Sequence, residues 1–213
     1  MYRIKTPWWL PKLFNKKMVW KIPSGIKPAV YLTFDDGPHP VATPFVLEQL
    51  RAYNAKATFF CIGKNVVEYP AIYEQILEAG HSVGNHTQNH LNGWDTDAEK
   101  YIGNIIEASK SIDSRLFRPP YGRIRMAQAY MLTENRQPWK IIMWDVLSAD
   151  FDIKITPEKC LENVLKHIAP GSIVVFHDSA KAWDRMSYTL PRVLQYCREQ
   201  NWAVAAIDMP HYA

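Results

Sequence analysis

The sequence predicts a single-domain α/β protein in which about seven strand–helix units are wound into a barrel. Strand-like and helix-like patterns alternate from residue 29 onward, the strands are apolar on both faces, and 213 residues suit one domain. Such repeats imply a parallel sheet covered by helices, either as a closed barrel or as an open doubly wound sheet. Neither a G-x-G-x-x-G fingerprint nor a P-loop follows the first strand, so the usual nucleotide-binding open sheets are excluded and a barrel is favoured.

The strands are predicted from short runs rich in apolar and β-branched residues. In chain order they are residues 29–34, 56–63, 81–85, 116–121, 140–146, 172–178 and 203–209. The fourth of these is weakened by Pro119 and Pro120, because proline cannot donate a backbone hydrogen bond to a neighbouring strand.

The helices are predicted from apolar residues at three- and four-residue spacing and from residues that suit helix ends. They run from Thr43 to Asn54, through Ile72 to Gly80, through Ile102 to Ser109, from Thr156 to Ile168 and through Leu190 to Cys197. Thr43-Pro44 and Thr156-Pro157 suit the first turns of two of them, since proline is tolerated there, and Gly80 suits a C-terminal stop.

Residues 1–28 precede the repeat, and we treat them as an N-terminal arm of the barrel at 29–213. Because prolines interrupt any long amphipathic helix, we expect the aromatic residues of the arm to pack against the barrel. Contact of residues 1–21, which alternate basic and aromatic side chains, with an anionic membrane surface is the alternative. The formal net charge of +4 is too small to suggest a nucleic-acid partner.

The sequence leaves the compartment and the oligomeric state open. No apolar run is long enough for a secretory signal or a membrane-spanning helix, which favours the cytoplasm.

Polar side chains gather at the carboxyl ends of the predicted strands, which share one face of a parallel barrel and form the site where such enzymes carry their chemistry. They are Asp35, Asp36, His86, His90, Arg118, Tyr121, Asp150, His177 and Asp178. Residues far apart in the sequence are therefore expected to converge.

Three of these residues have the ligand chemistry of a divalent metal site. Asp36 supplies a carboxylate, and His86 and His90 supply two imidazoles, which together leave coordination positions open for water and substrate. The histidine pair alone would be a weak signal. A cation bound by Asp36 would also relieve the repulsion between the adjacent carboxylates of Asp35 and Asp36.

In order along the chain, five short segments resemble the motifs of the polysaccharide deacetylases, carbohydrate esterase family four. They are Thr33-Phe34-Asp35-Asp36-Gly37-Pro38, His86-Thr87-x-x-His90, Arg118-Pro119-Pro120-Tyr121, Ser148-x-Asp150 and Val174-x-x-His177-Asp178. The resemblance covers residues 29–209 and implies a distorted (β/α)7 TIM-like barrel that removes acetyl groups from N-acetylated sugars with the help of a metal. The substrates of this family point outside the cell, in contrast to the missing export signal.

The resemblance also implies residue roles. Asp35 would be the general base, Asp36, His86 and His90 the metal ligands, and His177 the general acid. Arg118 would pair with Asp35, and Asp150 with His177. The backbone N–H of Tyr121 would help to bind the oxyanion.

The remaining expectations concern substrate contacts. Phe151 stands where this family usually has tryptophan, and Val175 stands where leucine is common in the pocket for the acetyl methyl group. Trp94, Phe151 and Trp183 fall in loops on the active face, where they could stack on sugar rings or simply pack as lids. The ring of Tyr121 is expected near the substrate.

The sequence therefore predicts a metal-dependent N-deacetylase of oligosaccharides or polysaccharides that contain N-acetylglucosamine, such as chitin fragments or peptidoglycan glycan. Zinc is the preferred ion, with cobalt, nickel or manganese as alternatives. The alternatives for the protein are an O-acetyl esterase acting on xylan-like polysaccharide and a carbohydrate-binding barrel without catalysis. A hydrolase for a small N-acylated molecule or a glycolipid is a further one.

Overall fold

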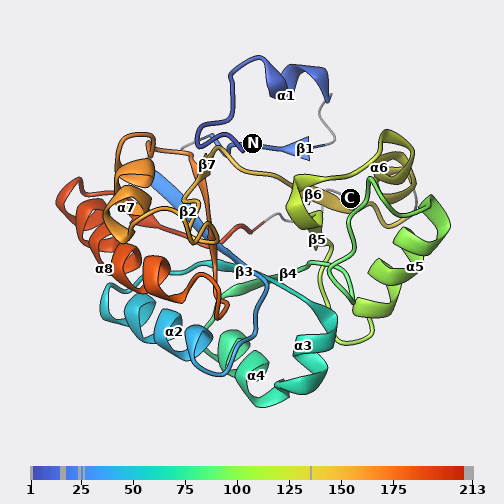
Figure 1. Ribbon diagram of the computed structural model, residues 1–213, viewed down its shortest axis with the longest axis horizontal. Helices are drawn as coiled ribbons and strands as arrows, with labels where there is room; N and C mark the ends of the chain where they lie inside the picture. The colour runs from blue at the N-terminus through green and yellow to red at the C-terminus, as the bar shows by residue number, and fades with distance from the viewer. Residues whose placement is uncertain (1, 15–17, 24, 26, 135, 209–213) are drawn as a thin grey trace.

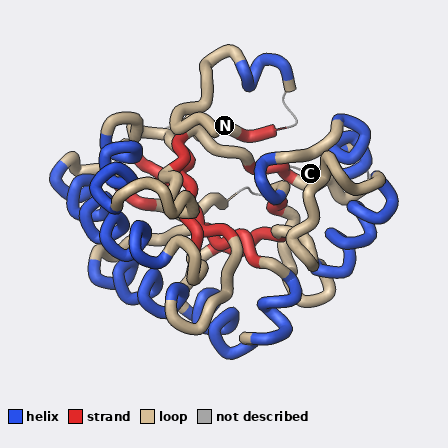
Figure 2. The backbone as a smooth tube through the Cα atoms, in the orientation of Figure 1, coloured by secondary structure: helices blue, strands red, loops and turns tan. Residues whose placement is uncertain are grey.

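Parallel strands form a curled sheet that helices surround on its outer side (Figures 1 and 2). The computed structural model describes residues 2–14, 18–23, 25, 27–134 and 136–208. Its strands are β1 (Met18–Val19), β2 (Ala29–Asp35), β3 (Thr58–Cys61), β4 (Ser82–Asn85), β5 (Leu116–Phe117), β6 (Lys140–Ile142), β7 (Val146–Leu147), β8 (Ile173–His177) and β9 (Ala203–Val204). This architecture confirms the predicted single-domain α/β barrel.

The strand order places the predicted motifs next to one another. The sheet runs β1-β6-β5-β4-β3-β2-β8-β7, and β9 pairs with β2 outside this path. In the middle of the sheet, β2 pairs in parallel with β3 on one side and with β8 on the other. Asp35 stands opposite His177 in the second pair, so two residues 142 positions apart in sequence become neighbours.

The helices are α1 (Leu10–Leu13), α2 (Ala42–Ala52), α3 (Gly63–Glu68), α4 (Pro70–Glu78), α5 (Ala98–Ala108), η2 (Pro120–Gly122), α6 (Met126–Thr133), α7 (Pro157–Leu165) and α8 (Trp183–Glu199). The predicted helices correspond to α2, α4, α5, α7 and α8, and Thr156 caps α7 as expected, with its side chain accepting from Lys159 N–H. No helix in the described part of the chain has the length and apolar character needed to cross a membrane.

Alternating side chains of β2 and β8 separate the core from the site, because successive residues of a strand point to opposite sides. On one side, apolar residues of both strands pack in the large core cluster together with residues of α2 and α8; these are Val30, Leu32, Phe34, Val174 and Phe176. On the other side stand Thr33 and Asp35 of β2 and Val175 and His177 of β8. The alternation therefore directs the predicted base and acid to the same side of the sheet.

The predicted strand at 140–146 is divided in two, β6 and β7. The carbonyl oxygens of Ile142 and Met143 accept hydrogen bonds from the side chain of Arg118, which takes the place of a neighbouring strand at this point. β7 then pairs with β8 rather than with β5. The last predicted strand is also shorter, since only Ala203–Val204 is a strand, and Met209 lies outside the described residues.

The N-terminal arm connects the two ends of the curled sheet (Figure 1). β1 pairs in parallel with β6, and Lys5 forms an antiparallel bridge with Val146 of β7. Met18 and Trp20 are buried in a second core cluster, whereas Trp8 is 76% exposed and Trp9 46% exposed. Lys16 and Lys17, basic residues of the arm, lie outside the described residues.

Candidate active site

The base expected in the first motif, Asp35, is paired with a buried arginine. Asp35 is 4% exposed, and its Oδ1 accepts a hydrogen bond of 2.7 Å from Nη1 of Arg118. The guanidinium is fully buried and also donates to Thr33 Oγ1, Ile142 O and Met143 O. It lies 4.1 Å from the centroid of the Phe60 ring. With so many partners the guanidinium is fixed in place, and it leaves Asp35 Oδ2 as the oxygen that can act on a ligand.

The acid expected in the last motif, His177, is held by a buried carboxylate. Asp150 Oδ1 lies 2.7 Å from His177 Nδ1, and Asp150 Oδ2 accepts from the backbone N–H of His177 at 2.7 Å. Burial alone would lower the pKa of His177, but Asp150, with smaller contributions from Asp36 and Asp35, raises that pKa to about 10. The ring is therefore protonated at neutral pH, with Nδ1 committed to Asp150 and Nε2 left to donate its proton.

The three predicted metal ligands, Asp36, His86 and His90, also come together. One ligand atom from each lies within 4.8 Å of the others. Asp36 Oδ1 is 3.2 Å from His90 Nε2 and 3.7 Å from His86 Nε2. Asp36 follows β2, and both histidines follow β4, so this cluster sits at the carboxyl ends of the strands.

The donor atoms of this cluster suit a divalent cation. His86 Nδ1 donates to Arg118 O at 2.7 Å, which leaves the lone pair on Nε2, and burial lowers the pKa of His86 to about 4, so the ring is neutral. His90 Nδ1 is 3.1 Å from the hydroxyl of Tyr121. Asp36 Oδ1 is buried and makes no hydrogen bond with any residue that the structure describes.

The charge state of Asp36 is also that of a metal ligand. Burial raises the pKa of Asp36, but the three neighbouring imidazoles, led by that of His90, outweigh burial and bring the pKa below its usual range. An ionised carboxylate oxygen beside the Nε2 atoms of two imidazoles is a donor set that zinc and similar ions prefer.

The loops that carry these residues adopt strained backbone conformations. Among the described non-glycine residues, seven have positive φ, and five of these lie in or next to the motifs: Asp36, Thr87, His90, Tyr121 and Ala149. Positive φ costs on the order of 1–3 kcal/mol per residue and persists where the surrounding structure enforces it. The strain is thus concentrated in the segments that aim the polar side chains.

Asp178, next to His177, holds the loop that carries Asp36. Its carboxylate accepts from the backbone N–H of Gly37 at 3.1 Å and from the hydroxyl of Thr43. A Cβ at Gly37 would lie 2.1 Å from a carboxylate oxygen of Asp178, so only glycine fits there. Burial raises the pKa of Asp178 to about 8.

Three of the five predicted substrate contacts adjoin these groups. The Tyr121 ring is 62% exposed and lies 4.6 Å from the His90 ring. The Phe151 ring lies 5.2 Å from the His177 ring. Val175 is 1% exposed and points to the same side of β8 as His177, which stands two positions later in the strand.

The two tryptophans predicted to contact substrate are engaged with other side chains. The ring of Trp94 is 55% exposed and lies 5.1 Å from the guanidinium of Arg123. Trp183 packs edge-on against Phe45 at 5.3 Å, beside the core cluster beneath α2 and α8. Trp183 thus packs against a neighbouring side chain, whereas Trp94 keeps more than half of its surface exposed.

Sequence reasoning assigned no role to three residues that contact the catalytic pairs or their neighbours. Thr33 accepts from Arg118, Arg185 of α8 donates from Nε to the backbone carbonyl of Asp150 at 2.6 Å, and Tyr2 contacts Phe151 at 5.2 Å. The signal for Thr33 was present, since it stands two residues before Asp35 in a strand. Arg185 and Tyr2 gave no local signal, because their partners lie far away in the sequence.

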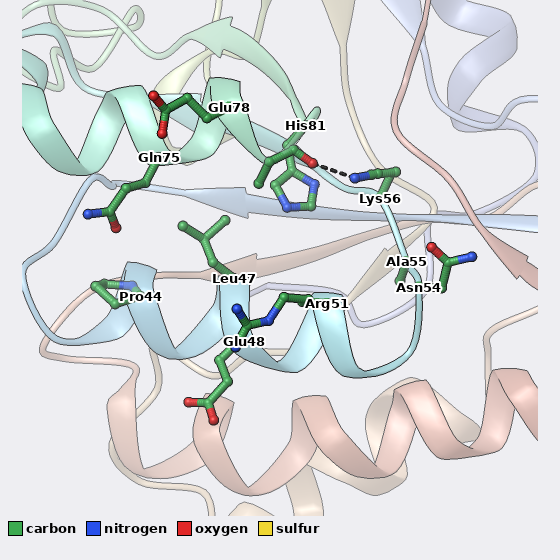
Figure 3. Close-up of a pocket in the computed structure, with 11 residues that line it drawn as sticks. Pro44, Leu47, Glu48, Arg51, Asn54, Ala55, Lys56, Gln75, Glu78 and His81 are labelled. Carbon is green, nitrogen blue, oxygen red and sulfur yellow. Dashed lines mark hydrogen bonds between the residues drawn. The ribbon is translucent and has the colours of Figure 1, made fainter.

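A pocket of about 530 Å³ lies elsewhere, between α2 and α4 (Figure 3). Among its lining residues, Lys56 stands just before β3 and His81 just before β4, so the pocket opens at the amino ends of these strands. None of the motif residues lines it. The predicted chemistry and this pocket therefore occupy opposite ends of the strands.

Comparisons with known proteins identify the family. The family model described as polysaccharide deacetylase matches residues 23–135, more than half of the chain. A peptidoglycan-N-acetylglucosamine deacetylase of Bacillus cereus is 32% identical over 197 residues, which cover 90% of this chain and 91% of that protein. A chitooligosaccharide deacetylase of Azorhizobium caulinodans is 36% identical over 168 residues, which cover 73% of this chain and 79% of that protein.

The fold leads to the same family. A solved structure of a peptidoglycan N-acetylglucosamine deacetylase superimposes with a TM-score of 0.83 at 30% sequence identity, and the match covers 94% of each chain. Sequence, fold and the convergence of all five motifs at one end of the strands agree, and the chain belongs to the polysaccharide deacetylase family.

Proposed function

We propose that this protein removes N-acetyl groups from sugars in N-acetylglucosamine-containing glycans, such as peptidoglycan glycan or chitin fragments, with a divalent metal ion, preferably zinc. One observation carries the proposal. Three groups of side chains meet at the carboxyl ends of neighbouring strands. They are the buried pair of Asp35 with Arg118, the pair of His177 with Asp150, and the cluster of Asp36, His86 and His90. The names of the similar proteins from Bacillus cereus and Azorhizobium caulinodans support the substrate class.

Asp36, His86 and His90 would hold the ion. When bound, it would lower the pKa of a water molecule and polarise the acetyl carbonyl. Cobalt, nickel or manganese also suit a carboxylate with two imidazoles. The other steps of the reaction would be carried out by side chains and one backbone N–H of the protein.

Asp35 would take the proton of the attacking water on Oδ2, because Oδ1 is bonded to Arg118. The fixed guanidinium restricts the rotation of the carboxylate, so the accepting oxygen is oriented before substrate arrives. A backbone N–H donor at Tyr121 would stabilise the negative charge that develops on the acetyl oxygen.

His177 would deliver a proton from Nε2 to the nitrogen of the leaving amine. An amine is a poor leaving group unless it is protonated, so hydrolysis of the amide needs this acid more than hydrolysis of an ester does. Asp150 keeps the ring protonated and sets its orientation through two hydrogen bonds. The base and the acid are thus each held in place by a buried partner of their own.

The test is acetate release from N-acetylchitooligosaccharides and from acetylated xylan in parallel, with zinc-loaded protein, chelated protein and Asp35→Asn. We expect release from the amide substrate, loss on chelation, and a loss of about 10²–10⁴-fold in Asp35→Asn. Asp113→Asn, which changes an exposed aspartate, is the matched control and should retain full activity. Release from xylan alone would replace the proposal with an O-acetyl esterase, and sugar binding without release would indicate a binding protein.

A further inference from the structure

The N-terminal arm reaches the mouth of the active site through its residues 2–6. The backbone N–H of Leu147 donates to Ile4 O at 2.8 Å, and that of Thr6 donates to Asp145 O at 2.9 Å. Lys5 adds a 2.6 Å ion pair with Asp145 and a bond to His167 O. This segment is therefore held along β7 by backbone and side-chain contacts together.

The register of this pairing determines where Tyr2 lies. Lys5 stands opposite Val146 in an antiparallel bridge, so each step toward the N-terminus of the arm corresponds to a step toward the C-terminal end of β7. Tyr2 then falls opposite Ala149, next to the loop that carries Asp150 and Phe151. The edge pairing thus delivers an aromatic side chain of the arm to the loop that holds the acid.

Two ring contacts connect Tyr2 to the acid. Its ring centroid lies 5.2 Å from that of Phe151, edge-on at 71°, and the Phe151 ring lies 5.2 Å from His177 at 73°. The hydroxyl of Tyr2 donates to Asp152 Oδ2 at 2.5 Å, and Tyr2 keeps 39% of its surface exposed. Burial and Asp152 raise the pKa of Tyr2 to about 12, so the hydroxyl stays neutral and remains a donor.

We propose that Tyr2 and Phe151 together form an aromatic sugar-binding wall on the acid side of the active site, and that Tyr2 contacts the sugar next to the one that loses its acetyl group. The inference rests on the proposed function. It assigns to the arm, which lies outside the five motifs, a part in substrate specificity.

The chemistry determines which sugar lies against this wall. His177 must reach the nitrogen of the leaving amine, so the sugar that carries this nitrogen lies beside His177 and hence beside Phe151. Tyr2 is one ring farther from His177, where the neighbouring sugar of an oligomer would lie. Aromatic rings suit the C–H faces of pyranose rings, so the ring of Tyr2 is the part that would contact this sugar.

The experiment measures binding apart from hydrolysis. The parent protein is zinc-loaded Asp35→Asn, which is titrated calorimetrically with N-acetylglucosamine and with its β-1,4-linked tetramer. The same titrations are made with Asp35→Asn variants that also carry Tyr2→Ala, Tyr2→Phe or Phe151→Ala. Tyr130→Ala, at a tyrosine of α6 that is 60% exposed, is the matched control. Melting temperatures of all variants check that folding is intact.

We expect Tyr2→Ala to weaken tetramer binding about three- to tenfold and to leave monosaccharide binding unchanged. Tyr2→Phe and Tyr130→Ala should bind as the parent does, and Phe151→Ala should weaken both ligands. Equal binding by Tyr2→Ala and the parent would overturn the inference, as would a loss in Tyr2→Phe as large as that in Tyr2→Ala.

Acetate release by the wild type separates this inference from the function. If the wild type releases acetate but Tyr2→Ala does not change tetramer binding, the inference is wrong and the proposed function stands. Tetramer binding that depends on the Tyr2 ring, without release, supports the inference and removes the catalytic proposal. If the protein neither binds the tetramer nor releases acetate, both the inference and the proposed function are wrong.

Discussion

The amino and carboxyl ends of the strands differ in whether their buried polar atoms have hydrogen-bond partners, and cavity volume does not reveal this difference. At the amino ends, the pocket between α2 and α4 is lined by two positively charged and two negatively charged side chains, those of Arg51, Lys56, Glu48 and Glu78 (Figure 3). Lys56 donates to Ala79 O. At the carboxyl ends, a buried oxygen of Asp36 has no hydrogen bond within the described part of the chain, although a buried polar atom without one costs about 1–3 kcal/mol. Converging donor atoms without hydrogen-bond partners therefore indicate a functional site better than cavity volume does.

The two histidines in these regions show the same contrast. His81 at the pocket accepts a hydrogen bond from Ala57 N–H, and burial lowers its pKa to about 4. His86 has an equally low pKa, again because of burial, but its free Nε2 faces Asp36. A neutral buried histidine therefore becomes a ligand only where its second nitrogen meets other donors.

The largest effect expected is that of removing a metal ligand. In His86→Ala, we expect acetate release to fall by at least about 10³-fold, since a catalytic ion supplies several kcal/mol of transition-state stabilisation. Zinc at 1,000 times its Kd should stabilise the wild type by about 4 kcal/mol, and so raise its melting temperature by roughly 10 °C.

Thermal melts with zinc and with chelator measure this difference directly. His86→Ala should lose the zinc-induced rise, whereas His81→Ala, the matched buried histidine at the other end of the strands, should keep it. An undiminished rise in His86→Ala would show that zinc binds outside the proposed cluster and would erase the contrast between the two histidines.

Removal of the acid should have the next largest effect. His177→Asn is expected to lower amide hydrolysis about 10²-fold or more, because the leaving amine then lacks its proton donor. Hydrolysis of an acetyl ester by the same variant should fall less. The ratio of the two rates in His177→Asn and in the control His167→Asn measures the need for the acid, and an equal loss on both substrates would contradict the assigned role.

Asp150→Asn should shift the pH dependence more than it lowers the maximal rate. Asp150 raises the pKa of His177 to about 10, so its loss should bring that pKa toward the ordinary value of about 6.5. The acid must be protonated, so activity is lost as pH rises through this pKa. The alkaline limb of kcat/KM should therefore move to lower pH, and above the new pKa the rate should fall about tenfold per pH unit.

A pH–rate profile of Asp184→Asn, which changes an exposed carboxylate of α8, provides the control for that shift. Its alkaline limb should coincide with that of the wild type. If the alkaline limb of Asp150→Asn also coincides with that of the wild type, a group other than His177 determines the position of this limb.

The sequence predicted the barrel and most of the site because both follow from local patterns. Strand–helix alternation determines the parallel sheet, and residues just after strands converge wherever that sheet curls. Asp35 and His177 could therefore be placed together before their register was known. The roles of the motif residues came from the family resemblance, which local periodicity alone does not supply.

The parts that sequence reasoning missed depend on distant partners or on weak periodicity. β1 has two residues, too few for an alternating pattern, and its partner β6 lies more than 120 residues away. In α6, Met126, Tyr130 and Met131 are exposed, so apolar residues do not form one stripe. The break between β6 and β7 follows from the side chain of Arg118, which no local window includes.

The smallest effect is expected at the pocket between α2 and α4. The double substitution Arg51→Ala with Glu78→Gln changes two exposed side chains and removes one charge of each sign, so the local net charge is preserved. Surface changes of this kind usually alter stability by about 0.5 kcal/mol or less, and we expect acetate release within about twofold of the wild type. The two residues lie at the opposite ends of the strands from the catalytic pairs, and rigid strands separate them. Steady-state kinetics and a melting curve of this variant measure both quantities. A tenfold loss of activity at an unchanged melting temperature would mean that the pocket takes part in substrate binding, and the division of the molecule into a chemical end and a structural end would then fail.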